Sequence, residues 1–88
     1  MHKIILILPE ENKTYLLDTY TNCDLGEILP LVLAWRKKII KSGINKKQFR
    51  VKSLKKDGKY WFSSGIPPEY CFHEDDINNM DIFKGEVK

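Results

Sequence analysis

The sequence has few of the features that mark secreted or membrane proteins. It contains only two cysteines in 88 residues, Cys23 and Cys71, whereas small secreted domains normally carry more. Its longest apolar run, residues 4–8, is far below the roughly 20 residues that span a bilayer. The run is also short for a secretory signal, and no small-residue cleavage site follows it. We therefore expect a reduced, cytoplasmic (intracellular) chain with no membrane contact, and the pairing of the two thiols stays open.

The motifs of common enzymes are also missing. The five glycines are isolated, so neither a Gly-x-Gly-x-x-Gly nor a Gly-x4-Gly-Lys phosphate-binding pattern occurs. Cys71 and His73 could be neighbours on a strand, but a thiol nucleophile also needs a group that orients its base. Cysteine and histidine spacings typical of zinc sites are absent, and residues 74–76 lack the alternating ligands of a calcium loop. The sequence predicts no enzyme, no cofactor and no metal site.

Arginine is scarce, and the charges that are present are strongly segregated. Residues 1–35 carry a net charge of −3 and residues 60–88 a net of −4, whereas residues 36–59 hold eleven basic side chains and one acid, a net of +10. Only two of the fifteen basic residues are arginine. Lysine is a flexible point charge, which suits phosphate backbone better than base edges. A solvated, Lys-rich face would give the same composition, so both interpretations stay open.

The residue pattern predicts two pairs of strands. Residues 2–8 form a continuous β-branched run, which is typical of a central strand covered on both faces. Residues 14–21, rich in threonine and aromatics, predict the returning strand. Residues 47–55 alternate between apolar and polar, and the Asp-Gly step within residues 56–59 favours a tight turn into a strand at 60–63.

A helix is predicted between the two pairs. Asp24 and Glu27 have the spacing of a capping box at its start. Pro30 either begins the main helix or kinks it, and Gly43 is suited to end it. The apolar stripe that we expect to face the sheet consists of Ile28, Val32, Trp35 and Ile39.

These elements follow the order β-β-α-β-β. They predict one α+β domain over residues 1–88, in which one helix packs on a four-stranded mixed sheet. A C-terminal loop, a short helix from about residue 73 to 80 and a loose tail at about 84–88 complete it, and residues 70–72 could add one short further strand. In element order, this layout resembles the β-grasp fold.

The Lys-rich hairpin at 46–59 is a candidate surface for nucleic acid or an acidic partner. Lysines neutralise phosphates, and the neighbouring Tyr60 and Trp61 could stack on bases. The alternative is that the charges only keep an edge hairpin from aggregating. The predicted contact residues are Lys46, Lys47, Arg50, Lys52, Lys55, Lys56 and Lys59.

The aromatic, Pro-rich segment that follows is a candidate protein-binding surface. Large aromatics on a stiff loop are typical of binding hot spots, although the loop could simply close the end of the core. The predicted contact residues are Trp61, Ile66, Pro67 and Tyr70.

We therefore predict a small non-catalytic binding protein that docks on a larger protein or nucleoprotein partner. The alternative is a sequence-tolerant nucleic-acid-binding domain that uses the 46–59 hairpin. The Lys, Ile and Asn usage is associated with phage or mobile-element inhibitors and adaptors of AT-rich bacteria. The partner's identity and the oligomeric state stay open.

Overall fold

A computed structural model describes residues 1–22, 24–63 and 70–83. It is a small α+β domain with one main helix, as the sequence predicts. The described strands form one mixed sheet in the order β5-β4-β3-β1-β2-β6, in which only the β2–β6 pair is parallel. The elements are β1 (His2–Leu8), a 3-10 turn (Pro9–Glu11), β2 (Lys13–Tyr20), α1 (Leu25–Lys41), β3 (Arg50–Asp57), β4 (Tyr60–Ser63), β5 (Cys71–His73), α2 (Glu74–Asn78) and β6 (Asp81–Ile82).

The sheet is wider than the four strands that the sequence predicts. The described residues form six strands, and the two at the edges of the sheet, β5 and β6, have three and two residues. Of these, β5 overlaps the short strand suggested at residues 70–72, whereas the two residues of β6 give no periodic apolar pattern. β1 lies between β3 and β2 and is antiparallel to both. The β-grasp order suggested by the sequence of elements is not confirmed.

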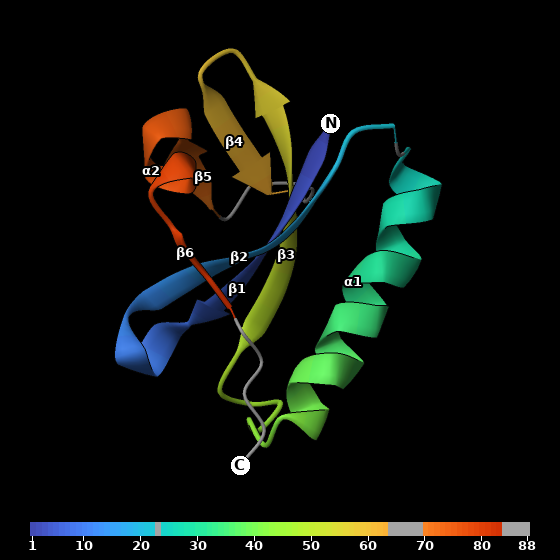
Figure 1. The fold of residues 1–88 in the computed structure, drawn as a ribbon, viewed down its shortest axis with the longest axis vertical. Coiled ribbons are helices and arrows are strands. Elements are labelled where there is room, and N and C mark those ends of the chain that lie inside the picture. Colours follow the sequence, from blue (N-terminus) through green and yellow to red (C-terminus); the bar gives the residue numbers. More distant parts are fainter. Residues whose placement is uncertain (23, 64–69, 84–88) are drawn as a thin grey trace.

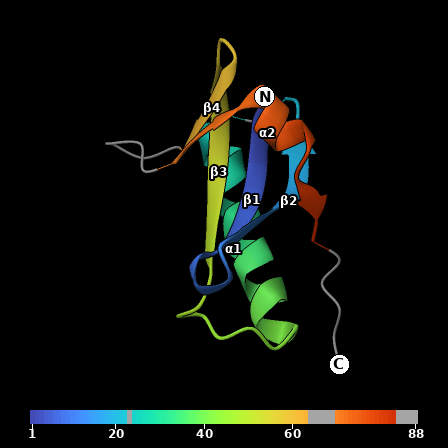
Figure 2. The ribbon, with the colours of Figure 1, turned by 90° about the vertical axis from the view of Figure 1, so that its left-hand side faces the viewer.

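The sheet separates two small cores. Figure 1 shows α1 on one side of the twisted strands and α2 on the other, and Figure 2, viewed from the side of α2, shows α1 behind the strands. Because side chains alternate along a strand, β1 contributes to both cores and is central, as predicted. The α1-side core contains Ile4, Leu6, Leu8, Leu17, Ile28, Ile39, Phe49 and Val51. The α2-side core contains Ile5, Ile7, Leu54, Trp61 and Ile77.

The capping residue predicted for α1 is confirmed. The Asp24 side chain accepts a hydrogen bond from the backbone N–H of Glu27 at 2.9 Å. The helix begins at Leu25, so Pro30 lies inside it rather than at its first position. Gly43, just after the helix, has a φ of +102°, a conformation that glycine adopts without strain. Neither helix of the described chain has the length and apolarity of a membrane-spanning segment.

Candidate polyanion-binding surface

Strand β3 carries most of the predicted basic residues, and its two described neighbours pair with different parts of it. It pairs with β1 from residue 50 to residue 55, but with β4 only from residue 54 to residue 57. The mismatch arises because β4 has only four residues and ends at Ser63. Among the described residues, positions 50–53 of β3 therefore have a neighbouring strand on one side only.

A hollow of about 280 Å³ lies beside residues 50–52 of β3. Phe49 and Val51 form its apolar lining, and both are at least nine-tenths buried in the α1-side core. No acidic residue occurs among the described residues that line it. Its remaining lining consists of Arg36, Lys46, Lys47, Arg50 and Lys52, which we call the basic hollow.

Three segments of the chain place these cations together. Phe49 and Val51 pack against α1, and because neighbouring side chains on a strand point to opposite faces, Arg50 and Lys52 point away from that core. Asn45 holds the turn before β3, since its side-chain oxygen accepts the N–H of Lys47 at 2.9 Å. Arg36 comes from α1. The hollow is thus built by the helix, the turn and the strand.

The hollow concentrates charge of one sign. Five cationic residues lie around about 280 Å³ and repel one another, and no acidic residue occurs among the described lining. An anion entering the hollow would meet several donors at once. Next to it, the Lys52 Nζ lies 5.9 Å from the ring centroid of Tyr70, at the distance of a cation–π contact.

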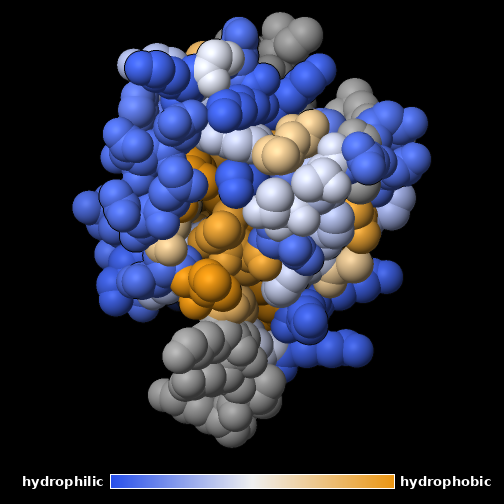
Figure 3. Space-filling model, turned by 45° about the horizontal axis from the view of Figure 1, so that its top comes forward, coloured by the Kyte–Doolittle hydropathy of each residue, from blue (hydrophilic) through white to orange (hydrophobic). Residues whose placement is uncertain are grey.

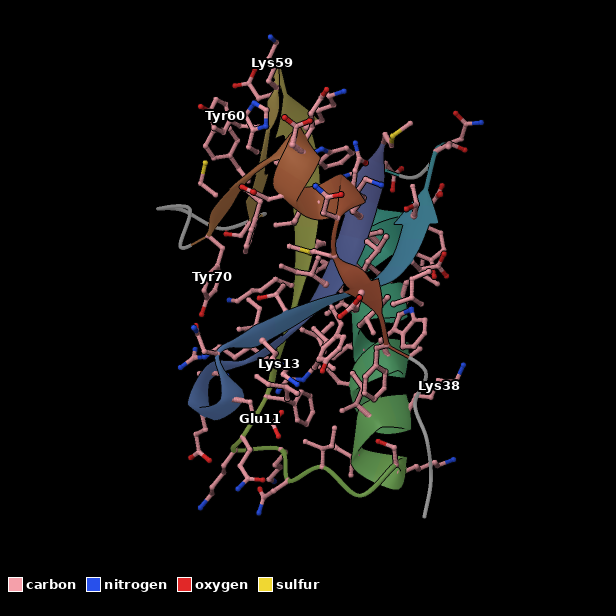
Figure 4. All side chains as sticks on the ribbon, turned by 60° about the vertical axis from the view of Figure 1, so that its left-hand side comes forward. Glu11, Lys13, Lys38, Lys59, Tyr60 and Tyr70 are labelled. Atoms are coloured by element: carbon pink, nitrogen blue, oxygen red, sulfur yellow. The ribbon has the colours of Figure 1, made fainter. Side chains whose placement is uncertain are left out.

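The structure divides the seven predicted basic residues into two groups. Lys46, Lys47, Arg50 and Lys52 line the hollow, whereas the other three lie near the far end of β3. There, the Lys56 Nζ lies 3.3 Å from a carboxylate oxygen of Glu74 and 5.9 Å from the Trp61 ring centroid. Lys59 is in the turn between β3 and β4, at the tip seen in Figure 4. Part of the charge at this end is therefore offset by acids.

The predicted protein-contacting residues are dispersed. Trp61 is only 3% exposed and lies in the α2-side core, with the Lys3 Nζ 5.2 Å from its ring centroid, so it belongs to the core rather than to a contact surface. Tyr70 is half-buried and stacks on Phe72, with ring centroids 6.4 Å apart. Ile66 and Pro67 lie outside the described residues.

Arg36 is the lining residue that the sequence analysis missed. It had no assigned contact role because it belongs to the helix rather than to the 46–59 hairpin. A signal was present, since Arg36 lies four residues after Val32 and three before Ile39. On a helix, such spacings place a residue beside the buried stripe, at the border between core and solvent.

The cysteine and histidine of β5 share one face of the sheet. Cys71 pairs across β4 with Phe62, and His73 pairs with Tyr60. Cys71 is a free, exposed thiol, and the His73 Nδ1 accepts the N–H of Asp75 at 3.2 Å, at the start of α2. No cluster of three or more potential metal ligands occurs in the described part of the chain. Cys23 lies outside that part.

Apolar surface is exposed as well. On α1, the outward-facing Leu29, Leu33 and Ile40 are 53%, 60% and 46% exposed, and in β6 Ile82 is 66% exposed. Figure 3 shows one hydrophobic area in the middle of a largely hydrophilic face. Each of these exposed residues lies on α1 or on β6, whereas the basic hollow is lined by α1, the turn before β3 and β3 itself.

No protein-family model, no curated protein and no solved structure matches this chain. A function has to be inferred from the geometry of the surface itself, of which the basic hollow is the most distinctive part.

Proposed function

We propose that this protein is a non-catalytic binding protein whose basic hollow holds the phosphate backbone of nucleic acid without sequence preference. The observation that carries the proposal is that five cationic residues line one hollow at the edge of β3, and that no acid occurs among its described lining. Positive charge that follows a groove is how proteins bind nucleic acid backbone in general. Of the two functions that the sequence left open, this geometry favours the nucleic-acid-binding one.

The residue types in the hollow support backbone binding rather than the recognition of bases. Three of the five cations are lysines, which act as mobile point charges. The other two, Arg36 and Arg50, offer planar donors that match two phosphate oxygens at once. Neither type needs a particular base, so we expect affinity to depend on the number of phosphates and not on the sequence.

The number of cations sets the expected salt dependence. Each phosphate contact to a single strand contributes about −0.7 to the slope of log affinity against log salt, so five contacts give a slope of about −3.5. Affinity should then fall by about 100-fold between about 50 and 200 mM salt. A surface that only solvates the protein would show no such binding at either salt concentration.

Fluorescence anisotropy with labelled oligonucleotides tests the proposal. The variant Arg36→Gln/Arg50→Gln removes two cations from the hollow, and the slope should become shallower by about 1.4. The control Lys13→Gln/Lys38→Gln removes the same charge from exposed positions that do not line the hollow, which Figure 4 shows on β2 and α1. Its slope should match the wild type. Absence of binding at about 50 mM salt, or equal losses in the two variants, would contradict the proposal.

Docking on an acidic protein partner is the second candidate. It is favoured by the exposed Leu33 and Ile40, which lie three residues before and four after Arg36 on the same flank of α1. In that case, Leu33→Ala should weaken capture of the partner, and oligonucleotides should not compete with it. Competition by oligonucleotides would favour the first candidate.

A further inference from the structure

The face of β4 and β5 that is turned away from α2 carries an aromatic patch. Along β4, Trp61 points into the α2-side core, so Tyr60 and Phe62 point to the opposite face. Across the β4–β5 pair, Tyr60 is opposite His73 and Phe62 is opposite Cys71. Alternation therefore brings four side chains of the two strands to one surface.

The rings of this patch touch one another but pack on neither core. The ring centroids of Tyr60 and Phe62 are 6.3 Å apart, and those of Tyr60 and His73 are 5.2 Å apart in an edge-on contact. Tyr60 is 47% exposed, and neither Tyr60 nor Phe62 belongs to the described clusters on the α1 or the α2 side. Figure 4 shows Tyr60 at the outer end of the sheet, near the hairpin tip.

Charges of both signs border the patch. Lys55 lies directly across from Phe62, and Lys59 precedes Tyr60 in the turn. Two acids also border it: Asp57 lies across from Tyr60, and a carboxylate oxygen of Asp75 lies 3.4 Å from the His73 Nδ1. The phosphates of a ligand are therefore assigned to the basic hollow and its bases to the rings, which is the division of roles by which proteins bind single strands.

Strand β3 connects the patch to the basic hollow. Val51 lines the hollow and Lys55 borders the patch, four residues further along the same strand and, by alternation, on the same face. At about 3.3 Å per residue, the two positions are about 13 Å apart along the strand. A few nucleotides of extended single strand can therefore place phosphates in the hollow and bases on the patch.

We propose that Tyr60 and Phe62 stack on unpaired bases of a single-stranded nucleic acid whose backbone lies in the basic hollow. This inference rests on the proposed function and specifies the ligand. A duplex keeps the faces of its bases inside its own stack, so it offers the rings nothing to stack on. The protein should therefore prefer single strands over duplexes.

The experiment compares three probes with the same number of phosphates: a thymidine oligomer, the same strand with abasic residues, and a duplex. The wild type should bind the thymidine strand most tightly. Tyr60→Ala should weaken it by about 5- to 150-fold, the range for the loss of one stacked base. Tyr60→Phe keeps the ring and should bind as the wild type, and the salt slope should be the same in all three proteins.

The abasic strand separates the two proposals. It should bind more weakly than the thymidine strand with the same salt slope, and Tyr60→Ala should leave its affinity unchanged. If the wild type binds both strands equally and with a steep slope, stacking is refuted while the hollow keeps its role. If no probe binds, both proposals fail. The comparison of probes uses the wild type, so it remains valid even if Tyr60→Ala perturbs the fold. Ile82→Ala removes a side chain that is 66% exposed elsewhere on the protein, and it controls for a general loss of apolar surface.

Discussion

The orientation of α1 makes a sharp stability prediction, because two adjacent isoleucines face opposite environments. Ile39 is fully buried in the α1-side core, whereas Ile40 is 46% exposed. Ile39→Ala and Ile40→Ala remove the same atoms from the same turn of the same helix. Their difference in unfolding free energy therefore measures burial, with helix propensity held constant.

The expected magnitudes follow from the burial of each side chain. Truncation to alanine removes three carbons, worth about 2.4 kcal/mol when fully buried, and the cavity left in a packed core adds about 1 kcal/mol. The better helix propensity of alanine returns about 0.4 kcal/mol, so Ile39→Ala should lose about 3 kcal/mol. Ile40 loses about half of the transfer energy and leaves no cavity, so Ile40→Ala should lose less than about 1 kcal/mol.

Urea unfolding followed by tryptophan fluorescence provides the measurement. With an m value of about 1 kcal/mol/M, the midpoints of the two variants should differ by about 2 M. The m values should stay equal, which shows that both variants unfold from a similarly compact state. Equal losses at the two positions, or a larger loss for Ile40→Ala, would show that the helix faces the sheet differently and would refute the assigned core.

Two further predictions concern the ends of α1. Asp24→Ala removes the acceptor of the Glu27 N–H and should lower the unfolding free energy by about 1 kcal/mol, whereas Asp24→Asn should retain most of it; equal losses in urea unfolding would contradict the cap. Gly43→Ala should lower the unfolding free energy by about 1 kcal/mol because of backbone strain at a φ of +102°, and not because of a clash, since no atom lies within 4 Å of a Cβ placed there. Gly26→Ala, inside the helix, should be neutral or stabilising. A loss of the same size at both glycines would be inconsistent with this strain.

The parts of the fold that sequence predicts well have a repeating local signal. The stripe through Ile28 and Ile39 identified the buried face of α1, and both residues are fully buried. The Asp-Gly step identified the turn between β3 and β4, where Gly58 has a φ of +65°. In each case, neighbours in the chain determine the conformation, so no knowledge of distant residues was needed.

Features that depend on distant segments were not predictable in this way. The sequence places Tyr60, Trp61 and Phe62 in a row, and alternation separates the middle residue from the other two. Alternation alone does not determine whether Trp61, or Tyr60 and Phe62, face a core. The choice is made by Ile77 of α2, which packs with Trp61, and the shortness of α2 and β5 hides that contact from any periodicity argument.

The basic hollow also depends on segments that are distant in the sequence. Its lining bears on the alternative that the lysines only protect a strand edge. Charged side chains, lysine above all, protect a strand edge from pairing with another molecule. Protection accounts for the cations on β3 itself, but not for those that α1 and the turn add to a lining in which no acid occurs among the described residues. Repulsion among like charges opposes that arrangement in the unliganded protein. A bound polyanion would reverse the sign of this interaction, and for that reason we propose a ligand for the hollow rather than solvation alone.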